Sequence, residues 1–359
     1  MLKQILPIFF ITYLILVSGC KDSSHIIIPI VYEGGTMGTY YKVTLIPNDH
    51  NGIFIFDSSL DQEKLHELIE TELKIINNIA STYILDSEIS KFNNLSADNC
   101  IQASNDFLIL AVESIRINKL TNGYYNPLVG PLVNLWGFGP EKNQHHILPK
   151  YDYIASLMDL INIDNIFVDQ NNSLLCKRND VYFDLSGLAK GSAVDRISNL
   201  LKSIEAKNFL VDIGGELYAS GKNHNLDPWR LAVEKPIKDI SPIQTIVSIM
   251  QGGIATSGDY RNFFTIDNKN YSHIINPKTG YPSDSSLASV TVIHSSTQTA
   301  DALATGLMVM DFEEAKDFAN QNELAVYLIK RNINNGTNVT NDLLSSWHSE
   351  EFKNFIDYH

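Results

Sequence analysis

Helical and strand periodicities follow one another irregularly along this chain, and that order is the strongest constraint on its fold. Over residues 61–80, apolar residues recur every three or four positions, which predicts a helix. From residue 209 onward, short apolar and alternating runs dominate and predict strands. A doubly wound parallel sheet requires regular alternation of strands and helices. The order seen here therefore favours the α+β class, and a length of 359 residues suits two domains or one large one.

The same patterns place the other elements. Further helices are predicted over residues 104–121, 152–161, 187–204 and 298–310, with a helical pattern continuing to 322. Strands are predicted over residues 40–46, 166–169, 174–178, 181–185, 209–213, 216–221, 229–234, 245–250, 289–294 and 324–329. The segment 123–140 is rich in glycine, proline and aromatic residues, which is compatible with a structural loop or with one wall of an aromatic pocket.

The charge balance argues against one class of partner. Among 359 residues, Asp and Glu number 41 and Lys and Arg number 27, so the net charge is −14 at pH 7. An acidic surface repels the phosphates of nucleic acids, so we expect no nucleic-acid partner. An anionic ligand would have to be held by a local device, such as a metal ion, a helix N-terminus or a single lysine.

The N-terminus has the pattern of an export signal. Lys3 precedes a mainly apolar run over residues 5–17, which is shorter than the ~20 residues that a membrane-spanning helix needs. Small residues then stand directly before Cys20. Residues 1–19 resemble a bacterial lipoprotein signal peptide, with Cys20 as the lipidation site and residues 20–30 as a lipidated tether. An ordinary secretory signal or an N-terminal anchor helix is the alternative.

Two further cysteines, Cys100 and Cys176, follow that segment. They could pair in an oxidising compartment, but sequence alone does not show that their geometry permits a disulfide. The sequence favours two unpaired, buried thiols.

Two short segments carry residues suited to phosphate and metal chemistry. In residues 184–191, a predicted strand leads into a helix whose N-terminal N–H groups, together with Lys190, would bind an anion. The simpler alternative is that Asp184 or a neighbouring serine only caps the helix. Farther on, Asp301 and Thr305 are four positions apart on a predicted helix and share a face. A carboxylate and a hydroxyl are hard oxygen ligands that suit Mg²⁺ better than zinc.

Three other features admit a functional and a structural interpretation. His273 lies in the polar segment 272–280 and could act as a general base, although a lone histidine is more often structural. Glycines in residues 34–39 could let the backbone approach a ligand, or could form a plain turn before a strand. Tyr83, after the first predicted helix, could stack on a flat ring or pack in the core.

Taken together and in this order, these segments resemble the ApbE family of FAD:protein FMN transferases. The motifs that carry the resemblance are GTMGT (35–39), STY (81–83), SEISKFN (87–93), GPLVNLWGFGP (130–140), DLSGLAKG (184–191), VDIGGE (211–216), ATSGDY (255–260), SHIINPKTG (272–280) and ADALAT (300–305). The resemblance runs from residue 34 to about 328. It implies a single compact, T-fold-related catalytic domain of mixed sheets and packed helices over residues 31–345, with FAD bound in a cleft. A C-terminal tail over 346–359 would follow.

The resemblance also implies a site, residue by residue. The implied FAD contacts are Met37, Tyr83, Tyr125, Asn126, Pro127, Asp184, Lys190 and Ile275. The implied Mg²⁺ ligands are the backbone carbonyl of Gly187 and the side chains of Asp301 and Thr305.

The activity implied by the resemblance is Mg²⁺-dependent transfer of FMN from FAD to a threonine hydroxyl of an acceptor protein, with release of AMP and with His273 as the candidate base. The implied acceptors carry an Asp-Gly-x-Thr motif in ion-pumping NADH:quinone reductases or related electron-transfer subunits. A lipid anchor would hold the enzyme on the extracytoplasmic face of a bacterial membrane, with the inner membrane preferred. An Mg²⁺-dependent FAD pyrophosphatase and a non-catalytic FAD-binding lipoprotein are the alternatives.

Overall fold

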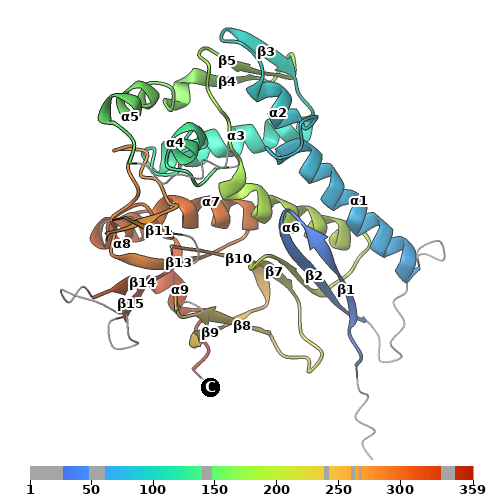
Figure 1. Cartoon of the computed structure of the whole chain (residues 1–359). Coiled ribbons are helices and arrows are strands. Elements are labelled where there is room, and N and C mark those ends of the chain that lie inside the picture. The colour runs from blue at the N-terminus through green and yellow to red at the C-terminus, as the bar shows by residue number, and fades with distance from the viewer. Residues whose placement is uncertain are drawn as a thin grey trace, which may run out of the picture.

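A broad antiparallel sheet forms the base of the domain in the computed structural model, which describes residues 27–47, 61–139, 148–237, 242–259, 263–266, 269–332 and 344–358 (Figure 1). The sheet has eight strands in the order β1-β2-β6-β7-β10-β13-β14-β15. Their bounds are Ile30–Thr36, Thr39–Ile46, Asn208–Ile213, Glu216–Ser220, Gln251–Gly258, Leu287–His294, Ala325–Arg331 and Leu344–His348. Every neighbouring pair is antiparallel, which agrees with the predicted α+β class.

Helices cover one face of this sheet (Figure 1). Helix α6 (Ser186–Ser203) packs on β6 and β7, and α7 (Thr297–Leu307) packs on β10 and β13. Helix α1 (Gln62–Ala80) lies against α6 and begins where the Asp61 side chain accepts a hydrogen bond from the Lys64 N–H. Helix α8 (Phe312–Gln321) follows α7 and contacts β14. The main hydrophobic core fills the space between these helices and the sheet.

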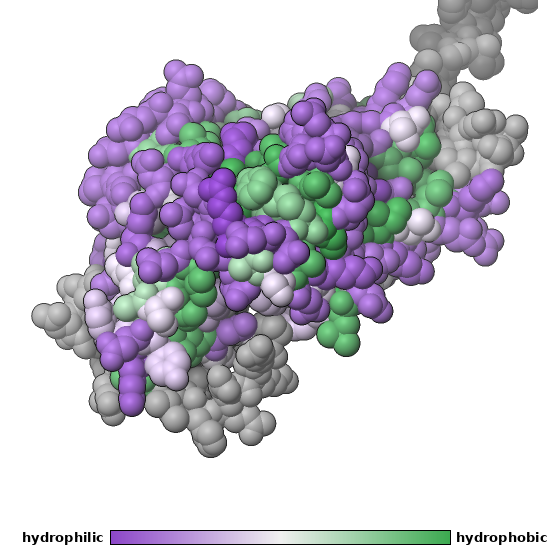
Figure 2. Space-filling view, turned by 90° about the horizontal axis from the view of Figure 1, so that it is seen from above, coloured by the Kyte–Doolittle hydropathy of each residue, from purple (hydrophilic) through white to green (hydrophobic). Residues whose placement is uncertain are grey.

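A smaller layer lies above the helices in Figure 1. It contains α2 (Glu88–Asn93), α3 (Asn105–Leu120), α4 (Gly130–Leu135), α5 (Tyr151–Met158), the 3₁₀ turn Ile163–Asn165 and a three-stranded sheet of β3 (Asn99–Gln102), β5 (Leu174–Lys177) and β4 (Ile166–Asp169). Seen from above, the surface is largely hydrophilic, with hydrophobic residues gathered in limited areas (Figure 2). The exposed apolar side chains of this layer include Ile109 and Phe167.

A second hydrophobic core lies on the other face of the large sheet. The hairpin of β8 (Trp229–Glu234) and β9 (Ile243–Ile249) packs there with α9 (Glu350–Lys353), around the fully buried Phe352. Because β15 pairs with β14 and α9 contributes to this core, a domain boundary at residue 345 would cut a strand. The C-terminal residues belong structurally to the domain.

Most predicted elements are present, but the strand predicted over residues 181–185 is wrong. That backbone has no strand partner; instead the Phe183 N–H donates to Asn93 Oδ1 (2.7 Å) and the Asp184 N–H donates to the Pro127 carbonyl (2.7 Å). The segment 123–140, compatible with a loop, contains the short helix α4. Elements outside the predictions are α2, α4, α9, β1, β3, β10, β15 and the hairpin of β11 (Phe263–Ile266) and β12 (Lys269–Ser272).

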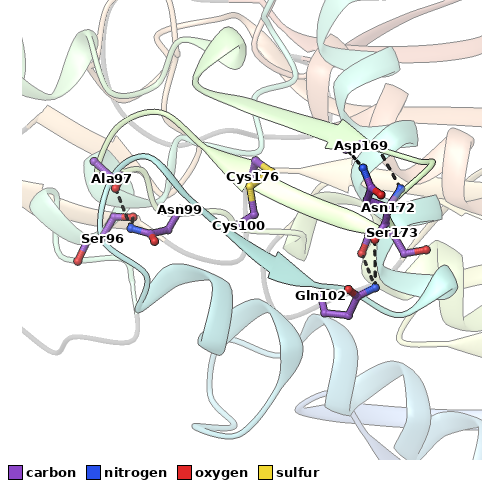
Figure 3. The surroundings of a disulfide bond; sticks show 9 residues. All are labelled: Ser96, Ala97, Asn99, Cys100, Gln102, Asp169, Asn172, Ser173 and Cys176. Carbon is purple, nitrogen blue, oxygen red and sulfur yellow. Dashed lines mark hydrogen bonds between the residues drawn. A yellow bond between two sulfur atoms is a disulfide. The ribbon is translucent and has the colours of Figure 1, made fainter.

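The expectation of unpaired thiols is wrong: Cys100 and Cys176 form a disulfide (Figure 3). The two residues face each other directly in the register of β3 and β5, with their Cα atoms 4.0 Å apart. Strand pairing between remote segments brings the sulfur atoms together, and spacing in the sequence does not report that pairing.

The predicted signal peptide, Cys20 and the predicted tether as far as residue 26 lie outside the described residues. Among the residues that are described, no helix is both long and apolar enough to cross a membrane.

Candidate active site

The centre of the candidate site is the close contact between α6 and α7. A Cβ atom on Gly191 would lie 2.4 Å from the Thr297 carbonyl oxygen, so only glycine allows the helices to approach this closely. The buried Asp301 carboxylate uses that proximity, because its Oδ2 accepts a hydrogen bond from the Gly191 N–H at 3.0 Å.

One turn away along both helices, two of the predicted metal ligands, Thr305 and Gly187, also meet. Thr305 Oγ1 lies 3.4 Å from the Gly187 carbonyl oxygen and donates to it. Gly187 and Gly191 are four apart on α6, as Asp301 and Thr305 are on α7, so the two contacts lie on facing sides of the helices. The three predicted metal ligands therefore gather at one place between α6 and α7.

Two buried carboxylates share one lysine at this place. Lys190 Nζ is 2.5 Å from Glu216 Oε1, and the Glu216 side chain is only 4 % exposed. Glu216 begins β7, and its Oε2 atom is buried without a hydrogen-bond partner among the described residues. The three side chains of Lys190, Glu216 and Asp301 together carry one excess negative charge when all are ionised. Such a site favours the approach of a cation.

Burial and mutual repulsion change the ionisation of both acids. Loss of solvation and the nearby Asp301 raise the pKa of Glu216 from 4.5 to about 8, although Lys190 opposes the rise. Burial likewise raises the pKa of Asp301, against the opposing effects of Lys190 and the Gly191 N–H.

We expect Glu216→Gln to flatten the pH dependence of stability of the metal-free protein. Because the folded-state pKa of Glu216 lies above its unfolded value, the folded protein holds an extra proton between pH 4.5 and about 8. The stability that this proton contributes is fully present below pH 4.5 and is lost as the pH rises through about 8. The melting temperature in EDTA should therefore fall across this window in the wild type and fall less in the variant.

The exposed Glu350 on α9 supplies the matched control, since Glu350→Gln should keep the wild-type slope. Parallel pH curves for Glu216→Gln and the wild type would show that the Glu216 carboxyl does not hold the proton.

Tyr125 closes one side of the site. Cβ atoms built on Gly187 and Gly306 would lie 3.1 Å from Tyr125 Cε2 and 3.0 Å from Tyr125 Cβ, so the ring sits between the two helices. The Tyr125 hydroxyl is buried without a described partner, and burial together with Asp301 raises its pKa well above the ordinary value. Tyr125 and Glu216 both interact electrostatically with Asp301, and each carries a buried oxygen that has no hydrogen-bond partner among the described residues. Such atoms fit a site completed by a ligand.

The loop that follows Tyr125 is hydrogen-bonded to the segment that leads into α6, because the Asp184 N–H donates to the Pro127 carbonyl. The predicted FAD contacts in these two segments are Asn126, Pro127 and Asp184. Asn126 donates from Nδ2 to the Ile161 carbonyl and accepts at Oδ1 from the Leu128 N–H, both at 2.9 Å. Asp184 Oδ1 accepts from the Ser186 N–H at 2.8 Å, at the first residue of α6. The N-cap residue of α6 is Leu185, which makes no side-chain cap hydrogen bond, so Asp184 acts on the first turn from one residue before the cap position. Asn126 holds the conformation of its own loop. A contact of either with a cofactor stays a prediction.

Met37 lies in the turn between β1 and β2, and Tyr83 lies just beyond the C-terminal end of α1. Met37 occupies the hairpin turn with φ 50° and packs against the main core. The hairpin is held to α1 where Asn77 Nδ2 donates to Thr36 Oγ1 at 3.0 Å. Tyr83 follows the C-cap of α1 at Ser81 and is 77 % exposed, so its ring is accessible for stacking.

His273 and Ile275 lie in a segment that packs under α4. The His273 ring meets Phe138 edge-on with centroids 6.3 Å apart, and Ile275 is buried and bridges to Pro282. Trp136 anchors the segment, because its Nε1 donates to the Gly280 carbonyl at 2.8 Å. Two of the predicted motifs, 130–140 and 272–280, are therefore neighbours in space.

One hollow lies apart from these residues. A groove of about 610 Å³ runs between α3, the turn after β4 and the start of α7, and among the described residues it is lined by none of the predicted site residues. The predicted residues that meet around Asp301, and not this groove, therefore define the candidate site.

Comparisons with known proteins identify the family of this chain. Residues 37–328 match the sequence profile of the ApbE family. The chain belongs to the ApbE family. It is 40 % identical over 341 residues to a FAD:protein FMN transferase of Haemophilus influenzae, covering 93 % of this chain and 95 % of that protein. A FAD:protein FMN transferase of Vibrio cholerae is 38 % identical over 343 residues, covering 96 % of each.

Solved structures confirm the ApbE-like fold. The flavin transferase ApbE of Vibrio cholerae matches with a TM-score of 0.79 and 35 % identity, over 92 % of this chain and 99 % of that one. The apo form of Pseudomonas stutzeri flavinyl transferase ApbE matches with a TM-score of 0.79 and 30 % identity, over 91 % and 96 %. The predicted single compact domain of this ApbE-family member is therefore confirmed.

Glu216 is the residue of this ApbE-family site that the sequence predictions missed. The other acidic residue of its motif, VDIGGE, is Asp212, which accepts from the Gly215 N–H at 3.0 Å within the β6–β7 turn. The available signal was an acidic residue placed directly after two glycines at the start of a strand. The role of Glu216 on β7 depends on its ion pair with Lys190, which lies on α6.

Proposed function

We propose that this chain transfers FMN from FAD to a threonine hydroxyl of an acceptor protein, in a Mg²⁺-dependent reaction that releases AMP. The observation that carries the proposal is the convergence of Asp301, Thr305 and the Gly187 carbonyl between α6 and α7. The names of the relatives support the coarse activity, since they are FAD:protein FMN transferases.

The residues at the α6–α7 contact fit Mg²⁺. A carboxylate, a hydroxyl and a carbonyl are all hard oxygen donors, as this cation prefers. The excess negative charge and the partnerless oxygens of Glu216 and Tyr125 would be relieved by a bound cation with its water shell. When bound, Mg²⁺ would neutralise charge on the FAD diphosphate and orient it.

The remaining residues would bind and orient FAD. The start of α6 carries the positive end of the helix dipole, and Lys190 adds a positive charge in the second turn, so both favour a diphosphate beside Gly187. The exposed Tyr83 ring would stack on the flavin, with Met37 beside it. Tyr125, Asn126, Pro127, Asp184 and Ile275 are the other proposed contacts.

The chemical step is a substitution at phosphorus. The acceptor threonine oxygen forms a bond to the FMN-side phosphorus, the bond from that phosphorus to the bridging oxygen breaks, and AMP leaves with its electron pair. His273 would take the proton that the threonine hydroxyl loses. We propose an acceptor with an Asp-Gly-x-Thr motif in an ion-pumping NADH:quinone reductase or a related electron-transfer protein.

The enzyme would work on the extracytoplasmic face of a bacterial membrane, inner rather than outer, anchored through lipidated Cys20. The disulfide between Cys100 and Cys176 supports an oxidising compartment, since such bonds persist there.

The test uses purified residues 21–359 with FAD, Mg²⁺ and a protein carrying an Asp-Gly-Ala-Thr site. We expect the acceptor to gain the mass of one FMN, with an equal amount of AMP released. AMP with free FMN and an unmodified acceptor would favour the pyrophosphatase. Bound FAD without AMP would leave a carrier and overturn the catalytic role of Asp301 and Thr305.

In that assay, His273→Gln should lower the rate of FMN transfer by ~10²-fold or more, because general base catalysis contributes about that much. FAD affinity, measured by flavin fluorescence, should stay near the wild-type value. His224→Gln, in the β7–β8 connection, is the control and should leave both quantities unchanged. Near-wild-type transfer by His273→Gln would remove this residue from the role of base.

A further inference from the structure

The backbone that leads into α6 is held by a side chain rather than by a strand. Asn93, the last residue of α2, donates from Nδ2 to the Phe183 carbonyl at 2.9 Å and accepts at Oδ1 from the Phe183 N–H at 2.7 Å. This two-point pairing copies the hydrogen bonds that a neighbouring strand would provide. It satisfies both polar backbone groups of a residue that is fully buried.

A buried lysine holds Asn93 in turn. Lys177 is only 2 % exposed, and its Nζ donates to the carbonyl oxygens of Asn93 (3.1 Å) and Val181 (3.5 Å). The same ammonium lies 5.6 Å from the centre of the Phe92 ring. Lys177 therefore joins the end of α2 to the beginning of the segment 181–184. Its own strand, β5, is fixed to β3 by the adjacent disulfide at Cys176.

Aromatic packing completes this support. Phe183 contacts Phe92 and Phe107, with ring centroids 5.8 Å and 6.1 Å apart. The residue after Phe183 is Asp184, whose carboxylate binds the first N–H of α6. Gly187 follows within the first turn and meets Thr305. The position of Phe183 thus sets the positions of the groups proposed to receive the FAD diphosphate.

We propose that Asn93 and Lys177 are positioning residues for the diphosphate site, acting through the backbone of Phe183 on Asp184 and the start of α6. This inference rests on the proposed function, because it takes FAD as the ligand. Neither side chain touches the site itself. They fix the register of residues 181–187, which has no strand partner of its own.

Two variants remove the support without a large change in side-chain volume. Asn93→Asp keeps an acceptor for the Phe183 N–H but loses the donor to the Phe183 carbonyl. Lys177→Met keeps the length of the side chain and loses the N–H donors of the ammonium group. We expect each to weaken FAD binding in EDTA by at least tenfold in flavin fluorescence titrations. Hydrogen exchange in the peptide covering residues 181–187 should become faster.

The control is Ser349→Ala on the opposite side of the sheet. Ser349 is fully buried, and its Oγ donates to the Leu324 carbonyl and accepts from the Val326 N–H. The variant should lose thermal stability and yet keep the wild-type FAD affinity and the wild-type exchange of residues 181–187. All titrations are made at the same interval below each melting temperature, so that a general loss of stability does not imitate a loss of position.

The outcomes separate this inference from the proposed function. Wild-type affinity in Asn93→Asp and Lys177→Met, beside a wild type that binds FAD, would overturn the positioning role alone. An equal loss of affinity in Ser349→Ala would also overturn it, because the effect would then follow stability. A wild type that binds no FAD would overturn the proposed function and, with it, this inference.

Discussion

Asp301→Asn is expected to abolish Mg²⁺-dependent AMP release and, in the same protein, to raise the melting temperature measured in EDTA. The carboxylate is buried and repels Glu216, and Lys190 interacts with both acids, so the charge of Asp301 destabilises the metal-free fold. Asparagine keeps the acceptor for the Gly191 N–H and removes the charge. Loss of about 4 kcal/mol of transition-state stabilisation would lower the rate ~10³-fold.

The opposite signs of these two effects make the prediction specific. Mg²⁺ should raise the melting temperature of the wild type and not that of Asp301→Asn, because binding to the folded state alone stabilises it. The control is Asp311→Asn, which retains a good N-cap for α8 and should leave both the rate and the response to Mg²⁺ unchanged. Unchanged Mg²⁺ dependence in Asp301→Asn would refute the metal assignment.

Gly191→Ala is expected to lower the free energy of unfolding by about 3 kcal/mol or more and to inactivate the enzyme. The new methyl group would lie 2.4 Å and 2.7 Å from the Thr297 carbonyl oxygen and carbon, and 2.8 Å from Gln298 Cα. These are main-chain atoms, so no side chain can turn away. Helix α6 would have to move from α7, which separates the groups that meet between them.

Chemical denaturation measures this loss, and the AMP assay measures the inactivation. Gly35→Ala is the matched control, because the nearest atom to its new methyl group is the Thr39 carbonyl oxygen at 3.8 Å. It should unfold at nearly the wild-type denaturant concentration. A Gly191→Ala protein with wild-type stability would mean that the α6–α7 contact is looser than these distances indicate.

Elements with a strong local period were predicted closely. The helix expected over residues 61–80 is α1 (Gln62–Ala80). Its apolar face and its Asp61 cap both come from residues that are close together along the chain. The strands expected over 166–169 and 174–178 are β4 and β5, which pair with each other because a short turn joins them. Where the partner is close along the chain, the local pattern already contains the information.

Predictions failed where the partner is remote. Residues 181–185 have an apolar, strand-like pattern, but the partner of Phe183 is the Asn93 side chain, and no periodicity reports a side-chain amide. Strand β15 belongs to the large sheet because it pairs with β14 beyond an intervening segment. In both cases the backbone conformation depends on what packing places beside it.

The same distinction between local and remote partners applies to the candidate site. Residue order alone places Asp301 and Thr305 on one helix face, because 3.6 residues make a turn, and motif order alone indicates the ApbE family. Only the packed fold shows that Glu216 shares Lys190 with this site and that Cys100 bonds to Cys176. Those contacts join segments far apart in the chain, and their distances depend on how close the elements pack, as Gly191 permits for α6 and α7.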